Sequence, residues 1–204
     1  MKKLAIYIPS IETGGVEKNL LYISDYLSKK DIKIYIITAN YNKKKNFNKK
    51  INFITPKNNK WINSSRMIKT LICVYLILTK MPKKDISIFS FQSNFSSIIL
   101  SKIIGVKIII RLNTSLDKYI NNPIKRFFFR VIYSMSNKII TNGLDFKKNL
   151  KKVLNLHSVY IYNPINLKKK AKNNKIIIKN FINFGGLKVL SIGRLTDQKD
   201  QITI

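Results

Sequence analysis

Short apolar runs alternate with amphipathic segments along most of the chain. The runs Leu4–Ile8 and Val106–Leu112 are apolar on both sides, which is typical of strands covered on both faces of a sheet. Further strands are predicted at residues 34–38, 51–55, 86–91, 138–141 and 159–161, and helices at 16–29, from Ser64 or Ser65 to Thr79, 95–104, 123–135 and 144–153. This alternation predicts an α/β fold with a doubly wound, mainly parallel Rossmann-like sheet, in which the two doubly apolar runs lie near the centre.

The same pattern divides the chain into segments. Residues 1–165 are predicted to form one Rossmann-like domain, and residues 166–186 a linker rich in lysine and asparagine that ends at Gly185-Gly186. Leu187–Ile192 has the composition of a new buried strand. Residues 187–204 are therefore interpreted as the first strand and loop of a second Rossmann-like domain.

The charge is strongly positive, with 39 lysines and arginines against nine acids and a net charge of +30. Residues 41–84 alone carry eleven lysines and Arg66 with no acid. Three interpretations stay open: a solvated face combined with a compositional bias, an anionic membrane surface, or nucleic acid. Only five of the basic residues are arginine, which disfavours base readout because that readout prefers arginine.

Several classes of protein are disfavoured by what the sequence lacks. One cysteine (Cys73) and one histidine (His157) allow neither an internal disulfide nor the usual Cys/His zinc site, and both are expected to be ordinary structural residues. Neither the dinucleotide fingerprint nor the P-loop motif occurs. From the absence of these metal and cofactor motifs we expect no cofactor and no metal. Leu71–Leu78, the longest apolar stretch, is far shorter than the roughly 20 residues of a bilayer span.

Two loops that follow predicted strands have residues suited to phosphate. Gly14-Gly15 leads into a helix, where backbone N–H groups and the helix N-terminus favour an anion; a tight turn is the alternative interpretation. Arg194 and Lys199 flank the start of the next predicted helix after Leu187–Ile192 and suit a pyrophosphate, with an ordinary charged loop as the alternative.

Three segments together resemble the retaining GT-B glycosyltransferases of family 4. They are the Gly14-Gly15-x-Glu17 opening, the Asn163-Pro164-Ile165-Asn166 segment and, most specifically, Val189–Asp200 with its Gly-Arg-Leu-x-x-Gln-Lys run. The absence of an Asp-x-Asp motif agrees with this resemblance. It implies transfer of a sugar from a nucleotide-sugar donor with retention of configuration, the N-terminal domain holding mainly the acceptor and the C-terminal domain mainly the donor.

The resemblance also implies roles for individual positions. Gly14 and Gly15 would contact the donor phosphate through backbone N–H groups, and Arg194 and Lys199 would neutralise the diphosphate leaving group. Asn113 stands where many relatives carry a histidine near the reacting sugar. An amide can form hydrogen bonds but cannot accept a proton near neutral pH, so this departure weakens the expectation of a catalytic role.

The expected protein is thus a hexosyltransferase-type enzyme of bacterial surface polysaccharide synthesis, acting in the cytoplasm at the inner face of the membrane on a lipid-linked or saccharide acceptor. Relatives continue for most of another domain, which carries a Glu-x7-Glu pair. The 204-residue chain is therefore expected to be a truncated form without transfer activity, with weak nucleotide binding at most and a loosely packed tail over residues 167–204. The alternative function is a non-catalytic basic module for nucleic acid or anionic membrane.

Overall fold

The structure, a computed structural model, describes residues 2–11, 14–40, 46–58, 60–114, 116, 120, 122–165 and 185–186. The chain divides into two units, residues Met1–Ile165 and Asn166–Ile204. The first unit holds all the helices and strands described below. The predicted linker and the predicted strand at Leu187–Ile192 lie outside the described residues, apart from Gly185 and Gly186.

Strands and helices alternate along the first unit, as the apolar pattern predicts. The strands are β1 (Lys2–Tyr7), β2 (Ile32–Ile37), β3 (Asn52–Ile54), β4 (Ile86–Ser90), β5 (Lys107–Leu112), β6 (Lys138–Thr141) and β7 (Val159–Tyr160). The helices are α1 (Gly15–Ser28), α2 (Arg66–Lys80), α3 (Asn94–Ile103), α4 (Pro123–Ser134) and α5 (Leu144–Leu154).

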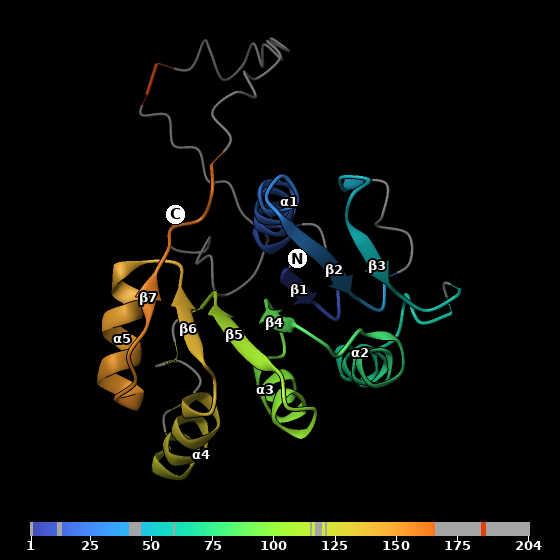
Figure 1. The fold of residues 1–204 in the computed structure, drawn as a ribbon. Coiled ribbons are helices and arrows are strands. Elements are labelled where there is room, and N and C mark those ends of the chain that lie inside the picture. Colours follow the sequence, from blue (N-terminus) through green and yellow to red (C-terminus); the bar gives the residue numbers. More distant parts are fainter. Residues whose placement is uncertain are drawn as a thin grey trace. The chain divides into compact units, whose positions relative to one another are not determined.

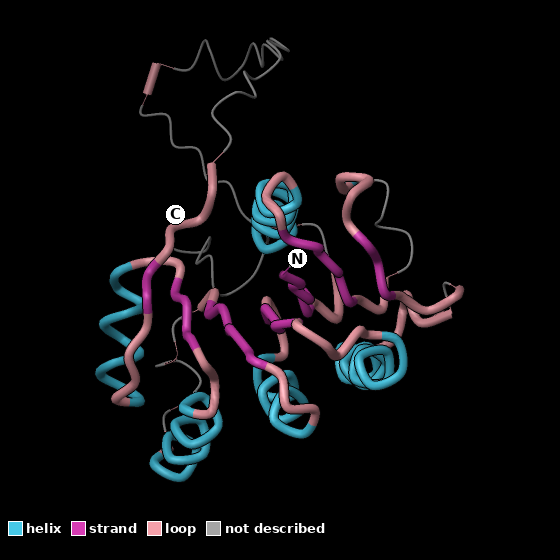
Figure 2. Tube along the Cα trace, viewed as in Figure 1, coloured by secondary structure: helices cyan, strands magenta, loops and turns pink. Residues whose placement is uncertain are grey.

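All seven strands pair in parallel, in the order β3-β2-β1-β4-β5-β6-β7. Helix α1 covers one face of this sheet, and α2, α3 and α4 lie together on the other (Figure 1). Figure 2 shows the same layers with every strand joined to the next by a helix or a loop. The predicted α/β Rossmann-like fold is confirmed, and neither β1 nor β5 is an edge strand.

Successive side chains of the central strands enter different cores, because strand residues alternate between the two faces. In β1, Ile6 packs in the cluster beneath α1, whereas Ala5 and Tyr7 pack in the larger cluster beneath the other helices. The larger cluster also holds Cys73 of α2. Cys73 thus lies in the core, as the sequence predicts, and its burial raises the pKa of the thiol to about 12, which disfavours a thiolate at neutral pH.

Local sequence signals fix several helix ends. The Ser65 side chain accepts a hydrogen bond from the Ile68 backbone N–H at the start of α2, 3.4 Å long. Asn122 does the same for Ile124 at 2.8 Å, ahead of a proline at the first turn of α4. Gly105, which follows α3, has φ +70°, a left-handed conformation that glycine adopts without steric cost.

Candidate functional site

The order of the strands locates the point where a ligand crevice is expected. From β1 the chain winds outward through β2 to β3, and from β4 it winds the other way through β5, β6 and β7. The direction reverses between β1 and β4, and in open parallel sheets ligands bind beyond the carboxyl ends of the strands at such a switch point. The loops after β1, β4 and β5 therefore make up the candidate site.

The loop after β1 carries the predicted phosphate-binding glycines. Gly14 and Gly15 are exposed at the N-terminus of α1. Gly14 has extended backbone, with φ 162°, and a Cβ built on either residue would meet no atom within 4 Å. Neither the backbone conformation nor the packing thus requires glycine at these positions, which leaves close approach of a ligand as a physical reason for the pair.

The preceding part of this loop is held by the end of β2 and by α2. The Asn40 side chain donates to the Ile11 carbonyl at 3.3 Å, and the Ala39 N–H donates to the Pro9 carbonyl at 3.1 Å. Lys69, a buried residue of α2, donates from Nζ to the Ser10 hydroxyl at 3.4 Å. These bonds fix the segment that leads toward the glycine pair, and they place the buried Lys69 side chain beside the end of β1.

The loop after β4 turns sharply into α3. Ser93, the residue before the helix, has φ 52° and ψ 45°, a left-handed conformation that costs a non-glycine residue about 1–2 kcal/mol. Its hydroxyl lies 3.1 Å from that of Thr70 in α2. Ser90 donates to the Asn94 side chain at 2.8 Å, and Asn94 in turn donates to the Arg111 carbonyl at 3.0 Å. A chain of hydrogen bonds therefore joins the β4 loop to β5.

Arg111, near the end of β5, is the largest fully buried side chain described, with 2% of its surface exposed. Its Nε donates to Asn113 Oδ1 at 3.3 Å and its Nη2 to Asn163 Oδ1 at 2.6 Å, and its guanidinium carbon lies 5.8 Å from the centre of the Phe91 ring. Both of these acceptors are neutral amides. Burial lowers the pKa of Arg111, although a guanidinium remains protonated at neutral pH.

Asn113 is held at both ends of its amide. Its oxygen accepts from Arg111, and its nitrogen donates to the Phe91 carbonyl at 3.0 Å. Asn113 thus connects the β5 loop to the β4 loop. The Arg111 network was not predicted from the sequence; the available signal was a charged residue near the end of a strand that is otherwise apolar apart from Lys107 at its start.

Three buried amide oxygens near the carboxyl edge have no hydrogen-bond partner in the described part of the chain. They are Asn40 Oδ1 after β2, Gln92 Oε1 after β4 and Asn142 Oδ1 after β6. A buried acceptor left without a donor costs about 1–3 kcal/mol.

The predicted site residues are thus partly brought together. Gly14 and Gly15 follow β1, Asn113 follows β5, and β4 lies between these two strands. Arg194 and Lys199 lie outside the described residues. Within those residues no group of three His, Cys, Asp or Glu side chains could hold a metal ion.

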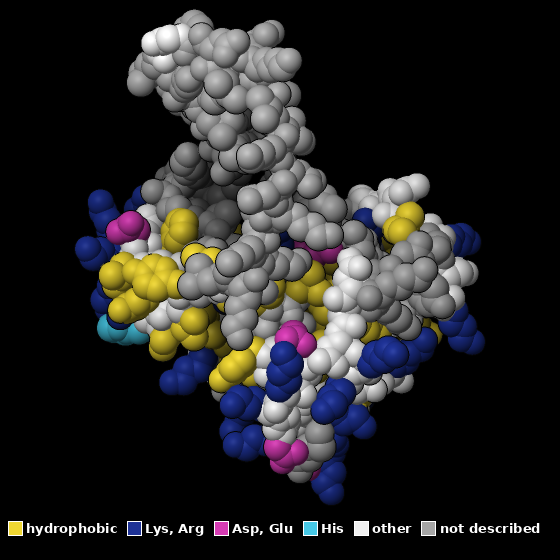
Figure 3. All heavy atoms as spheres, turned by 90° about the horizontal axis from the view of Figure 1, so that it is seen from above, with side chains coloured by type: hydrophobic (Ala, Val, Ile, Leu, Met, Phe, Trp, Pro, Cys, Tyr) yellow, Lys and Arg dark blue, Asp and Glu magenta, His cyan; other side chains and the backbone are white. Residues whose placement is uncertain are grey.

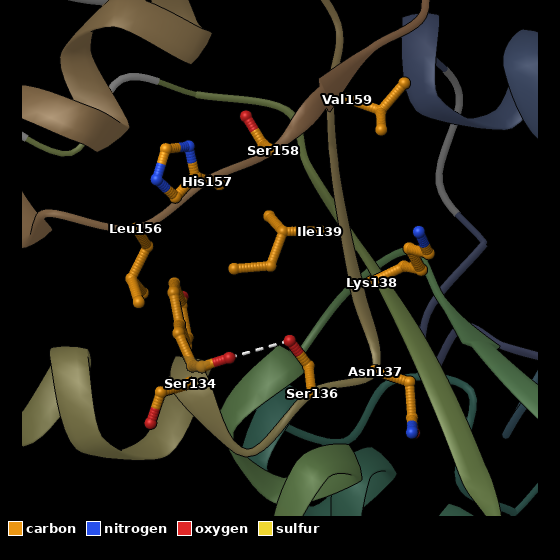
Figure 4. Close-up of a pocket in the computed structure, with 10 residues that line it drawn as sticks. Ser134, Ser136, Asn137, Lys138, Ile139, Leu156, His157, Ser158 and Val159 are labelled. Atoms are coloured by element: carbon orange, nitrogen blue, oxygen red, sulfur yellow. Dashed lines mark hydrogen bonds between the residues drawn. The ribbon is translucent and has the colours of Figure 1, made fainter.

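The hollow drawn in Figure 4 is not part of this site. Its volume is about 370 Å³, and it lies where α4 ends and β6 and β7 begin. It is therefore at the amino ends of the strands, opposite the candidate site at their carboxyl ends. Leu156, His157 and Ser158 enter it from the segment before β7, and Ser136 donates to the Tyr133 carbonyl at 2.7 Å on its other side (Figure 4). The candidate site is therefore confined to the loops at the carboxyl ends of the strands.

No family model matches the sequence, and no curated protein matches it significantly. Solved structures do match. One is Anabaena Alr3699/HepE in complex with UDP and glucose, with a TM-score of 0.53, 11% identity, and coverage of 81% of this chain and 45% of that one. The structure of the same protein with UDP-glucose matches with a TM-score of 0.50 and 13% identity, over 81% of this chain and 45% of that one.

A plant structure, apo UGT2 of Phytolacca americana, matches with a TM-score of 0.52 and 10% identity, over 83% of this chain and 53% of that one. The chain spans about half the length of the solved structures it matches. Identities this low show the fold alone. The chain has an α/β fold with a seven-stranded parallel, Rossmann-like sheet, and this fold is similar to about half of the HepE and UGT2 structures.

Proposed function

We propose that this chain supplies the acceptor-side half of a glycosyltransferase that uses a nucleotide-sugar donor. The observation that carries the proposal is the exposed Gly14-Gly15 pair at the β1/β4 switch point of a fold that matches half of a UDP-glucose complex. Neither glycine is required by backbone or packing, so a donor phosphate that approaches the helix N-terminus accounts for both.

The loops after β5 and β6 would face the acceptor. They are joined by a hydrogen bond from Asn142 Nδ2 to the Asn113 carbonyl, 3.5 Å long. We assign Asn113 a hydrogen-bonding role near the reacting sugar and not that of a base, because its amide takes no proton near neutral pH.

The reaction type, pathway and acceptor that we propose come from the resemblance of the sequence to family 4. The enzyme would be a retaining, family 4, hexosyltransferase-type protein of bacterial surface polysaccharide synthesis with a lipid-linked acceptor, working at the cytoplasmic face of the membrane. Arg194 and Lys199 would neutralise the diphosphate as it leaves, which lowers the barrier because charge develops there in the transition state.

A binding experiment separates this function from a basic module for polyanions. UDP-glucose and inorganic polyphosphate are titrated into the purified chain at low and at raised salt. We expect saturable binding of UDP-glucose, weak because much of the donor pocket belongs to the other half, and retained when salt abolishes polyphosphate binding. Salt-sensitive binding of any polyanion, with no effect of UDP-glucose, would instead support the basic module.

A further inference from the structure

The helices that cover one face of the sheet are apolar on their outer side as well as their inner side. Helix α3 lies between α2 and α4 and contacts both (Figure 1). Each of the three exposes large apolar side chains away from the sheet. An amphipathic helix normally has one apolar side, so this second apolar surface requires an explanation.

Helix α4 shows the pattern most clearly. Its exposed apolar residues follow the helical i, i+3, i+4, i+7 spacing and therefore form one stripe; they are Ile124, Phe127, Phe128 and Val131. Ile124 and Phe127 are 70% and 67% exposed. The core side of the same helix is formed by Tyr133, which is buried, and Phe129, whose ring packs edge-on against it at 5.5 Å.

Helix α2 carries a matching stripe. Met67, Leu71, Tyr75 and Leu78 are spaced by four, four and three residues and are all exposed, Leu71 by 61% and Tyr75 by 63%. The buried side of α2 is separate and consists of Cys73, Leu76 and Ile77. On α3, Phe95 and Ile103 are exposed too. A soluble surface rarely exposes this many large apolar side chains together unless it contacts a partner or a membrane.

The charges on these helices are of one sign. Helices α2, α3 and α4 contain no acidic residue, and their basic residues outside the core are Arg66, Lys80, Lys102, Lys125, Arg126 and Arg130. Between residues 32 and 144 the sequence has only two acids, Asp85 and Asp117. The complementary surface is therefore negatively charged as well as apolar.

We propose that the outer face of α2, α3 and α4 docks on an anionic lipid bilayer. The aliphatic and aromatic stripes would enter the boundary between headgroups and acyl chains, and the lysines and arginines would reach the lipid phosphates with their long stems along the apolar surface. A nucleic acid offers phosphates but no apolar layer for Ile124, Leu71 or Val131. A bilayer with acidic headgroups satisfies both features at once.

This face is not the same as residues 41–84, the region whose sequence carries eleven lysines and Arg66 with no acid. Within that region only the outward stripe of α2 belongs to the face, because Cys73, Leu76 and Ile77 of the same helix are core residues. Helix α4, outside it, contributes the exposed phenylalanines. In the part of the chain that the structure describes, no helix is long and apolar enough to cross a membrane.

The inference rests on the proposed function in one respect, that a lipid-linked acceptor would be presented at this surface. Its test is independent of nucleotide: vesicle co-sedimentation of the chain with phosphatidylcholine alone and with phosphatidylcholine mixed with phosphatidylglycerol. The double variant Phe127→Ser/Phe128→Ser is compared with Tyr26→Ser, which removes an exposed aromatic ring from α1 on the other side of the sheet.

We expect binding only to vesicles with phosphatidylglycerol, weakened by salt, and at least about tenfold weaker for the double variant. Tyr26→Ser should bind like the unchanged chain, and all three proteins should unfold at similar temperatures because the altered side chains are exposed.

Equal binding to neutral vesicles, or no loss in the double variant, would overturn the proposal. So would a chain that ignores vesicles but self-associates through these phenylalanines in sedimentation velocity. If the chain still binds UDP-glucose in any of those cases, the docking face alone is wrong and the proposed function stands.

Discussion

Replacing Gly15 with alanine is expected to weaken UDP-glucose binding at least about tenfold, about 1.4 kcal/mol, without weakening the fold. A methyl group at this exposed position meets no protein atom within 4 Å, so the folded chain accommodates it. Alanine in the first turn of α1 should leave the free energy of unfolding unchanged or raise it by up to about 1 kcal/mol. The methyl group would, however, occupy the space through which a phosphate reaches the backbone N–H.

The matched control is Gly143→Ala. Gly143 also precedes a helix on the carboxyl edge, with extended backbone and a nearest contact of 3.8 Å to Phe146, but it follows β6 and not β1. Isothermal titration and thermal unfolding of both variants separate binding from stability. Equal affinity of Gly15→Ala and the unchanged chain would show that the glycine pair is only a turn.

Replacing Arg111 with alanine should lower the free energy of unfolding by about 2–5 kcal/mol, the range for large-to-small changes in a core. The change removes the largest fully buried side chain and leaves a void against Phe91. It also removes the donors on which the oxygens of Asn113 and Asn163 depend. Urea unfolding followed by circular dichroism measures the loss.

Arg111→Met separates packing from charge. Methionine fills much of the same volume and spares the cost of burying a guanidinium, so we expect a loss below about 1.5 kcal/mol. The side-chain amide resonances of Asn113 and Asn163 should nevertheless shift, because their shared donor is gone. A loss as large as that of alanine, with those resonances unmoved, would show that Arg111 contributes packing and does not hold the amides of Asn113 and Asn163 in place.

The fold was predictable because its signals are local. Leu4–Ile8 and Val106–Leu112 are apolar on both sides, and the strands observed there, β1 and β5, are interior strands packed from both faces. Gly105 marked the end of α3 through the left-handed conformation that glycine permits.

What was missed depends on contacts between distant residues. Arg111 meets Asn163 from 52 positions away, and no periodicity encodes that pair. Periodicity also cannot identify the buried side of a helix that is apolar on two sides. Leu71–Leu78 is one apolar run in the sequence, yet Cys73 faces the core and Leu71 is exposed. For the same reason the outward stripe of α4, with Phe127, could not be told from a core-facing one until the buried side was known.

The most direct test of the proposed function is a residue-by-residue map of nucleotide-sugar binding. Amide resonances of the isotope-labelled chain are followed by nuclear magnetic resonance as UDP-glucose is added, with inorganic polyphosphate as the comparison. A donor phosphate at the switch point predicts saturable shifts at Gly14, Gly15 and Val16, at the start of α1, that polyphosphate does not reproduce. Shifts spread over the lysine-rich surface and identical for both ligands would contradict a glycosyltransferase donor site and leave a general polyanion-binding module.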